Sequence, residues 1–424
     1  MPLLIIGAGL AGLSAAQALL ARGVRDITVL EAGEGAGRGT SFANGALLHP
    51  SLAEPWNAPG VGWSLLRDLG NEQAAALVRL KAVPGLLGWG ARFLRESAPE
   101  RYLRNTLANL ALAWYSVPLM AELRAAGVQY RWQPSGSLVL FRGSEALRRA
   151  REWSAQLEAK GLRREWLTPA EAIAREPLLA PLQGQLAGAQ FNPEDERGDA
   201  QAYCDSLAAL LQREGVQLRY RTAVISIEAG NGRVAAVRTA TGERIACEQM
   251  VVAAASHSTP LLRGLGLRLP VQPVKGYSVT FERAPVGEAV LPRTPVIDPD
   301  LHVAVVPVGD DRLRVAGTAE FCGFDSRIAP ARVANLVGLA SRLYPQVADE
   351  AAFSRRPWIG LRPMCADGVA LVGRTRVGGL WLNTGHGHLG WTQAAGSGHL
   401  LADLLLGRQP ALDPSPYAPE RFGL

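Results

Sequence analysis

Three glycines near the start of the chain constrain its fold more than any other feature of the sequence. They are spaced Gly-x-Gly-x-x-Gly, at Gly7, Gly9 and Gly12. Before them, the aliphatic run at residues 3–6 is typical of a buried strand, and after them residues 13–23 are typical of a helix closed by Gly23. A second strand is expected at residues 26–31, with Glu31 at its end. This order of elements predicts a dinucleotide-binding βαβ unit.

Each glycine of this turn has a physical purpose in such a unit. The first permits the tight turn, the second lets backbone amides approach a pyrophosphate, and the third lets the helix pack closely on the strand. The pyrophosphate is expected at the helix start, beside Leu10 and Ala11, because the unpaired amides and the helix dipole favour an anion there. Glu31 can accept bonds from the ribose hydroxyls. FAD and NAD share this half, so the turn alone leaves both open.

Length and composition limit the remaining function classes. A chain of 424 residues with 48% hydrophobic and 19% charged residues predicts a soluble globular protein of two to three domains. The net charge of +6 comes without a polybasic run, which argues against nucleic-acid binding. The four cysteines form no C-x-x-C pair, so neither a metal site nor a disulfide framework is expected, and a cytoplasmic location is predicted. No apolar window is long enough to cross a bilayer.

A second glycine pattern lies close to the end of the chain. Residues 383–398 read NTGHGHLGWTQAAGSG, with a strand expected before the glycines and a helix after them. Only a proline-rich tail follows this helix, so no second βαβ unit can form around the pattern. We interpret it as a site for the other end of a flavin, because glycines admit a flat ring close to the backbone. The helix amides can then stabilise the electron-rich edge of the reduced ring. This pattern favours FAD over NAD.

Several segments together resemble those of bacterial FAD-dependent D-amino acid dehydrogenases, within the wider glycine oxidase, sarcosine oxidase and D-amino acid oxidase superfamily. They are the Gly7–Gly12 turn with Glu31, GRGTSFANGALLHPSLAEPWNAPG (37–60), FNPEDERGDA (191–200), VKGYSVT (274–280), RVAGTAEF (314–321), GLRPMCADGVALVG (360–373) and the C-terminal glycine pattern. The resemblance runs from end to end. One departure is visible at Arg38-Gly39 and Gly45-Ala46, which alters the backbone near the flavin and bears on substrate preference.

The resemblance implies an α/β fold. A Rossmann-like FAD-binding domain of the glutathione-reductase type, D-amino acid oxidase subclass, is interleaved with an α+β substrate domain built on an antiparallel sheet. The flavin domain is expected to comprise residues 1–70, 150–265 and 346–424, and the substrate domain residues 71–149 and 266–345. Within the first of these, residues 215–256 read as a strand, a meander with a tight Asn231-Gly232 turn, and a strand.

The resemblance also assigns the residues that contact non-covalent FAD. They are Gly7, Gly9, Leu10, Ala11, Gly12, Glu31, Arg38, Gly39, Thr40, Ser41, Asn44, Gly45, Val224, Gly360, Gly385, His386, Gly387, Leu389, Gly390, Trp391 and Thr392. Val224 is expected to contact the adenine through its backbone. Family members that tether the flavin use a cysteine upstream of the segment at residues 360–367, where this chain has Gly360, while Cys365 lies past that point.

Arg362 is the expected substrate clamp, since the arginine of Gly-x-Arg-Pro binds the substrate carboxylate in this superfamily. A planar guanidinium gives a carboxylate two parallel bonds. Tyr277 could reach the same carboxylate or simply pack in its sheet, and His388, like His386, could neighbour the ring or cap the helix. Other candidates are expected to be structural: His49, His302 and the PEDER cluster at 193–197, the last as a solvated loop.

The resulting expectation is oxidative deamination of a D-amino acid, or of a cyclic amino acid such as D-proline or a hydroxyproline. The hydride would pass from the α-carbon to flavin N5, and no general base is required. Oxidase relatives carry a lysine over N5; Val315 is the predicted occupant here, so a quinone or another non-oxygen acceptor is expected, with peripheral contact to the cytoplasmic face of the inner membrane. Two alternatives remain open: a glycine- or sarcosine-type oxidase, and a flavoprotein subunit of a larger dehydrogenase.

Overall fold

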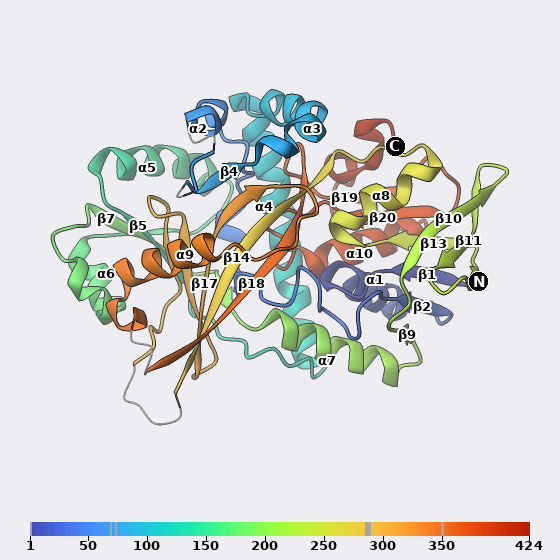
Figure 1. Ribbon diagram of the computed structural model, residues 1–424. Coiled ribbons are helices and arrows are strands. Elements are labelled where there is room, and N and C mark those ends of the chain that lie inside the picture. Colours follow the sequence, from blue (N-terminus) through green and yellow to red (C-terminus); the bar gives the residue numbers. More distant parts are fainter. Residues whose placement is uncertain (1, 68–69, 73, 285–289, 349–351) are drawn as a thin grey trace.

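The computed structural model describes residues 2–67, 70–72, 74–284, 290–348 and 352–424 (Figure 1). The predicted N-terminal βαβ unit is present: β1 (Leu3–Ile6), α1 (Leu10–Ala21) and β2 (Ile27–Leu30) follow one another, and the two strands are parallel neighbours. All four residues of β1 are buried because both faces of the sheet are covered. Leu3 and Ile5 pack among the helices, and Leu4 and Ile6 face a second sheet.

These strands belong to a six-stranded sheet that is parallel except at one edge. Its order is β19 (Leu371–Arg374), β20 (Leu380–Thr384), β13 (Gln249–Val252), β1, β2 and β9 (Gln217–Arg219), with β19 antiparallel to β20. Helices cover one face: α1, α4 (Pro99–Ala125), α7 (Ala200–Arg213) and α10 (Ala394–Leu405). On the other face lie α8 (Ser258–Leu262) and a meander of β10 (Val224–Gly230), β11 (Arg233–Thr239) and β12 (Arg244–Ala246) (Figure 1). The predicted turn between β10 and β11 is confirmed, with Asn231 and Gly232 both at positive φ.

Part of the C-terminal glycine pattern serves helix packing. A Cβ added to Gly398 would lie 2.6 Å from the carbonyl oxygen of Ser14 on α1, and one added to Gly396 would lie 2.9 Å from the carbonyl oxygen of Leu112 on α4. The backbones of α1, α4 and α10 therefore approach one another at distances that only glycine permits. Gly396 and Gly398 lie in α10, and helix packing does not account for Gly385, Gly387 and Gly390 in the loop before it.

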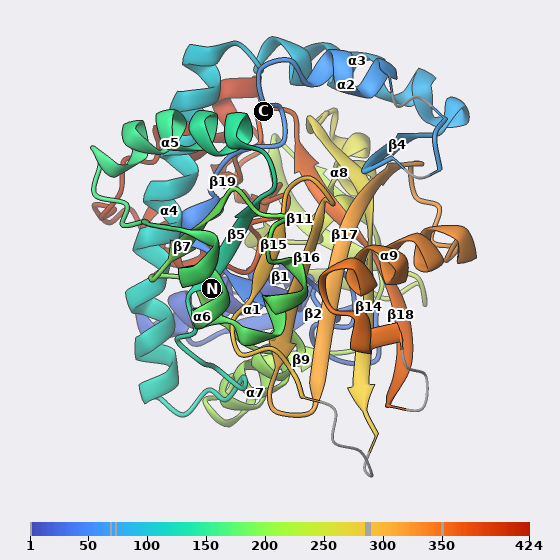
Figure 2. The ribbon, with the colours of Figure 1, turned by 90° about the vertical axis from the view of Figure 1, so that its left-hand side faces the viewer.

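A nine-stranded mixed sheet forms the second half of the molecule. Along the sheet lie β18 (Phe353–Cys365), β14 (Val271–Arg283), β17 (Arg312–Phe321), β16 (Val303–Val308), β15 (Val296–Asp298), β5 (Ser137–Phe141), β7 (Gly188–Asn192) and β6 (Glu165–Leu167), with β4 (Ala76–Val78) beside β17. Its outer face carries α9 (Pro330–Leu343) and α6 (Pro169–Arg175), and α5 (Ser144–Glu158) lies beside β5 and β7 (Figure 2). The expected antiparallel core of β14, β16 and β17 is present.

The predicted fold class is confirmed, whereas the expected domain limits differ from the sheet boundaries. Strands β6, β7 and β18 were expected in the flavin domain and belong to the nine-stranded sheet. Helix α4 was expected in the substrate domain, yet its buried residues pack with α1 and α10 under the six-stranded sheet. Sequence segments alternate between the two halves more often than the resemblance implied.

Candidate active site

A cavity of about 1490 Å³ lies between the two sheets. It runs from the turn after β1 to the region where β14 and β18 meet the loop after β20, and its lining includes Gly7, Glu31, Gly276, Arg362 and His388. Its volume exceeds the 300–1000 Å³ that a single small ligand usually occupies. There is room for a dinucleotide and a small substrate together.

The turn after β1 has the geometry that a pyrophosphate requires. Gly7 has φ +105°, and a Cβ on Gly12 would lie 1.9 Å from the carbonyl oxygen of Gly7. Gly9 is the N-cap of α1, and Leu10 and Ala11 at the start of the helix line the cavity. The residues present therefore fit FAD: the glycines form a cradle that any side chain would fill, and the helix start provides the donors.

Glu31 lines the cavity and already accepts two backbone bonds. Its Oε2 accepts from the amide of Ala8 at 2.7 Å, and its Oε1 from the amide of Gly33 at 2.8 Å. These bonds orient the carboxylate and leave lone pairs for further donors such as ribose hydroxyls. Val224 also lines the cavity, at the start of β10.

The loop at residues 37–49 follows the cavity wall and is tied to distant elements. Thr40 donates to the carbonyl of Leu361 at 3.0 Å, and Ser41 accepts from the amide of Leu10 at 3.4 Å. Arg314 donates to the carbonyl of Asn44 at 2.9 Å, a contact that the sequence did not indicate. Arg38 is partly exposed, and its guanidinium lies 3.8 Å from the carboxylate of Asp205 on α7.

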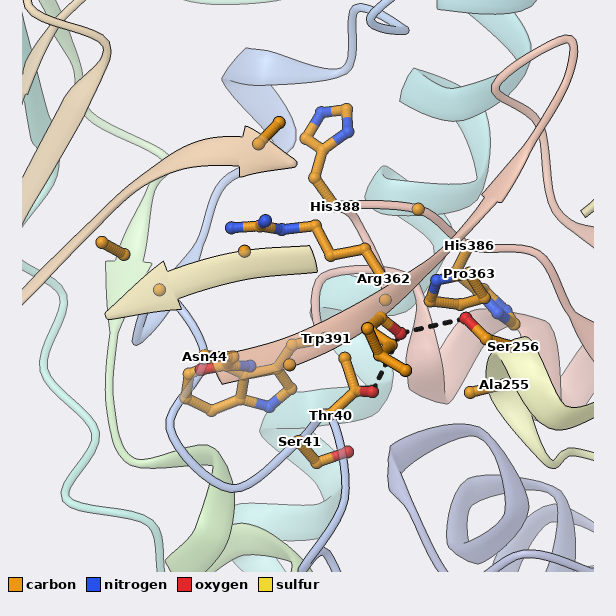
Figure 3. A pocket seen from close by; sticks show the side chains of 18 of the residues that line it. Thr40, Ser41, Asn44, Ala255, Ser256, Arg362, Pro363, His386, His388 and Trp391 are labelled. Atoms are coloured by element: carbon orange, nitrogen blue, oxygen red, sulfur yellow. Dashed lines mark hydrogen bonds between the residues drawn. The ribbon is translucent and has the colours of Figure 1, made fainter. Parts of the chain in front are cut away.

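The loop after β20 lies against the strand that carries Arg362. Gly385 and Gly387 have φ of +79° and +57°, and the amide of Gly387 donates to the carbonyl of Pro363 at 3.0 Å. Arg362 itself adjoins the carbonyl of Leu361, to which both Thr40 and Ser256 donate (Figure 3). Four segments far apart in sequence thus meet around one residue.

Most of the residues expected to contact the cofactor line the cavity, and a few support it from behind. The four that do not line it are Gly12, Gly385, Leu389 and Thr392. Gly12 packs on Gly7, and Thr392 accepts from the amide of His49 at 3.1 Å. These residues shape the wall through their neighbours.

Arg362 projects into the cavity and lacks a partner for part of its guanidinium (Figure 3). Its buried Nη1 has no hydrogen-bond partner, and the surrounding protein lowers its pKa to about 10, so it is still charged at neutral pH. Its guanidinium lies 5.3 Å from the ring centroid of Trp56. A Cβ on Gly276 would lie 1.6 Å from Nη1, so β14 needs a glycine there to let the arginine cross it.

Three histidines near this end are neutral because burial lowers their pKa. The values are about 4 for His49, about 4 for His386 and about 3 for His388. His388 stacks between His49 and Trp56, at centroid distances of 6.2 and 5.5 Å. The Nε2 of His386 is buried without a partner. His388 thus belongs to an aromatic wall beside Arg362, and His49, expected to be structural, lies in that wall.

The hydroxyl of Tyr277, an expected site residue, bonds to a residue that does not line the cavity. Its hydroxyl donates to Glu320 Oε2 at 2.7 Å, and its ring packs with Val279 and Phe281 in the cluster under α9. Gly276, Tyr277 and Ser278 all line the cavity, but the pairing of β14 with β17 shifts its register at Gly276, and the Tyr277 ring is buried in that cluster. The packed alternative for Tyr277 agrees with this placement.

Two further expectations need correction. Val315 was placed over the flavin ring, but its side chain lies in the same outer cluster, and β17 lines the cavity with Ala316, Gly317, Thr318 and Ala319. The PEDER cluster was expected as a solvated loop. Instead Asp195 is fully buried and accepts from Ser51 and Ser137, because this segment joins the cavity loop to the nine-stranded sheet.

The sequence analysis missed several lining residues. Trp56 lies in the 37–60 segment that carries the resemblance, but no role was assigned to it, to Trp358 or to residues 253–256. The alanines of 253–256 carried one usable signal: they directly follow β13, and carboxyl ends of parallel strands border the ligand cleft in such sheets. His302, expected to be structural, also lines the cavity, at φ +51°.

None of the four cysteines lines the cavity among the residues described there. Cys365 is fully buried, and Cys204, Cys247 and Cys322 lie in other parts of the fold. The lining also lacks a lysine, since Lys81 and Lys160 are exposed and Lys275 is buried beside Glu320 on the outer side of the sheet.

Comparisons with known proteins agree with this geometry. The family model described as FAD dependent oxidoreductase matches residues 3–404. The chain is 42% identical over 426 residues to a D-amino acid dehydrogenase of Paramagnetospirillum magneticum, covering 100% of this chain and 99% of the relative. It is 40% identical to a D-amino acid dehydrogenase of Methylobacterium sp. (strain 4-46), with 100% and 99% covered.

Solved structures show the same fold over the whole chain. Glycine oxidase from Geobacillus kaustophilus matches with a TM-score of 0.76 and 26% identity, covering 98% of this chain and 97% of that one. L-Proline dehydrogenase from P. horikoshii matches with a TM-score of 0.77 at 18% identity, covering 99% and 97%. With the glycine cradle and the matching family model together, the chain belongs to the FAD-dependent oxidoreductases and is an enzyme that uses FAD.

Proposed function

We propose that the protein oxidises a D-amino acid, or a cyclic amino acid such as D-proline or a hydroxyproline, to the corresponding imine. The observation that carries this proposal is the charged Arg362 with its unpartnered Nη1 in the cavity. A buried cation without a partner is costly unless a ligand supplies the anion. An α-carboxylate provides two oxygens in the geometry of a guanidinium. The D-configuration is suggested by the names of the relatives.

Each carboxylate that lines the cavity is already engaged by a protein group. Glu54 accepts from Trp153 Nε1 at 3.0 Å, and Asp298 pairs with Arg142 at 2.9 Å. Glu31 is engaged with backbone amides. Each acid among the described lining residues therefore has its own partner, and the charge of Arg362 further disfavours an ammonium group beside it.

The protein's contribution is then binding, alignment and exclusion of water. Arg362 would hold the carboxylate, and the wall of Trp56, His388 and His49 would enclose the substrate without adding charge. When bound, FAD would supply the two-electron acceptor at N5 for the hydrogen of the substrate α-carbon. Thr40 and Ser256 keep the strand of Arg362 in place through the Leu361 carbonyl. Alignment of this kind is sufficient for the rate when no base is needed.

The electrons are proposed to leave to a quinone or another non-oxygen acceptor. A glycine-oxidase-type reaction with oxygen is the second candidate, favoured by the likeness to the Geobacillus structure. A panel of D-, L- and N-methyl amino acids, assayed with a dye acceptor and with oxygen, separates the two. Turnover of D-amino acids with dye but not with oxygen supports the proposal. Preference for L- or N-methyl substrates would contradict the substrate class, and equal turnover with oxygen would contradict the acceptor.

A further inference from the structure

Two short helices at one edge of the molecule expose large apolar side chains. Helices α2 (Val61–Arg67) and α3 (Val83–Arg95) lie together at this edge, with β4 beneath them (Figures 1 and 2). Trp63 is 80% exposed and Leu66 is 67% exposed on α2. On and just before α3, Leu80 and Leu87 are 71% and 67% exposed. Apolar side chains of this size, gathered on one surface, usually mark an interaction site.

The exposed side chains of α3 follow a helical stripe. The stripe begins at Leu80, in the short turn before α3, and continues on α3 with Pro84, Leu87, Ala91 and Leu94, all exposed. Their spacing of three or four residues puts them on one side of the helix, opposite Trp89 and Phe93, which are buried. A Cβ on Gly62 of α2 would lie 3.1 Å from Leu94, so α2 borders the same stripe. We call Trp63, Leu66, Leu80, Leu87 and Leu94 together the α2–α3 surface.

Positive charge is in excess along the segment that carries the α2–α3 surface. Residues 61–104 contain seven Lys or Arg and four Asp or Glu. One of these acids, Glu96, is buried and lies 3.2 to 3.6 Å from three exposed arginines: Arg95, Arg101 and Arg104. One carboxylate cannot neutralise three guanidinium groups, so the border after α3 stays cationic, whereas Arg79 before α3 is paired with Glu72 and Glu320. Lys81, next to Leu80, is exposed as well.

We propose that the α2–α3 surface docks onto an anionic lipid bilayer. An apolar stripe with tryptophan and leucine, bordered by Lys and Arg, is the pattern of a helix that lies in the headgroup region. Among the described residues, no helix combines the length and the hydrophobicity that crossing a bilayer requires, so this contact is peripheral. Exposed apolar side chains beside excess positive charge match the apolar interior and anionic headgroups of such a bilayer.

The location of the surface connects it to the cavity. Val61, Ser64 and Leu65 of α2 line the cavity, whereas Trp63 and Leu66 of the same helix point outward. Docking would hold that side of the cavity beside the membrane. The proposal does not depend on the substrate class, because vesicle binding is measured without turnover.

The test is co-sedimentation of the full-length FAD-loaded protein with lipid vesicles. Vesicles of phosphatidylcholine with about 30 mol % phosphatidylglycerol are compared with phosphatidylcholine alone. The protein should bind the anionic vesicles preferentially, and added salt should weaken binding several-fold. The double variant Trp63→Ser, Leu87→Ser should bind about tenfold more weakly, with flavin absorbance and dye-linked turnover unchanged.

A matched control is Ile225→Ser, since Ile225 is 60% exposed on β10, in the three-stranded meander. It should bind vesicles like the wild type. Wild-type protein that sediments with neither vesicle, or a double variant that binds as well as wild type, would overturn the proposal. A lipid-free dimer that the double variant dissociates would also overturn it, in favour of a second copy on this surface.

Discussion

At the dinucleotide end of the cavity the carboxylate of Glu31 is bonded to nearby amides, whereas at the Arg362 end several polar groups have no partner. Glu31 accepts from the amide of Ala8, in the turn after β1, and from the amide of Gly33, close to it in sequence. At the other end, Arg362 Nη1, His386 Nε2 and Trp391 Nε1 are buried without partners. Buried polar groups are normally paired, so the second end is built to be completed by a ligand. The first end depends on close backbone packing, the second on charge and alignment.

The largest effect is expected from breaking the backbone packing. A Gly12→Ala substitution would put a Cβ 1.9 Å from the Gly7 carbonyl oxygen, so α1 and β1 could not keep their contact. We expect protein without flavin and without activity, measured by absorbance after purification. Gly338→Ala in α9 is the control, because nothing lies within 4 Å of its added Cβ. Normal flavin content in the Gly12 variant would show that the turn is not the cradle.

Arg362→Met should separate substrate binding from cofactor binding. Loss of a desolvated carboxylate pair costs about 2 to 5 kcal/mol, so kcat/KM should fall tens- to thousands-fold while flavin absorbance stays intact. Arg356→Met is the matched control on the same strand, since Arg356 is largely exposed and pairs with Glu282 at 2.9 Å. Steady-state kinetics with dye measure both variants. Equal kcat/KM for the Arg362 variant and the control would remove Arg362 from the site.

The same contrast explains what could be predicted from the sequence. The Gly7–Gly12 turn, its strand and its helix were predictable because close backbone contact allows few residue types and needs only neighbours in sequence. The role of Arg362 was predicted only from the resemblance, because its contacts with Gly276 and Trp56 join segments that are far apart in sequence. Val315 was wrongly placed over the flavin ring because a register shift of one residue moves a side chain to the opposite face of a sheet. The pairing of β14 with β17 has such an irregularity beside Gly276.

The rate at which the reduced enzyme reacts with oxygen tests the charge at the Arg362 end of the cavity. A cation near the ring favours oxygen reduction by stabilising the developing negative charge. Arg362 is the charged group at this end, and in the proposed reaction the carboxylate of the bound ligand pairs with it. The nearby histidines are neutral, with pKa values of about 3 and 4 for His388 and His386, and the described lining contains no lysine. Substrate-reduced enzyme mixed with air-saturated buffer in a stopped-flow instrument should therefore reoxidise more slowly than dye-linked turnover. Reoxidation fast enough to sustain turnover, with stoichiometric peroxide, would identify an oxidase.

The attachment of the flavin is expected to be non-covalent. None of the cysteines lines the cavity among the described residues, and Cys365, the nearest to Arg362 in sequence, is fully buried. Acid precipitation should release the yellow colour into the supernatant, where its absorbance can be measured. Colour that remains with the precipitated protein would contradict this expectation.

The smallest effect is expected from Tyr277→Phe. The hydroxyl of Tyr277 donates to Glu320, and that carboxylate keeps Arg79 Nε at 2.7 Å and Lys275 Nζ at 3.5 Å in the variant. Loss of one buried hydrogen bond should lower the stability by about 1 to 2 kcal/mol, seen as a Tm lower by a few degrees. The value of kcat/KM should change by less than about threefold, because the hydroxyl is held by Glu320, which does not line the cavity. A large fall in kcat/KM with unchanged Tm and flavin content would instead show that the hydroxyl reaches the substrate, and that β14 turns this residue toward Arg362 when the cavity is filled.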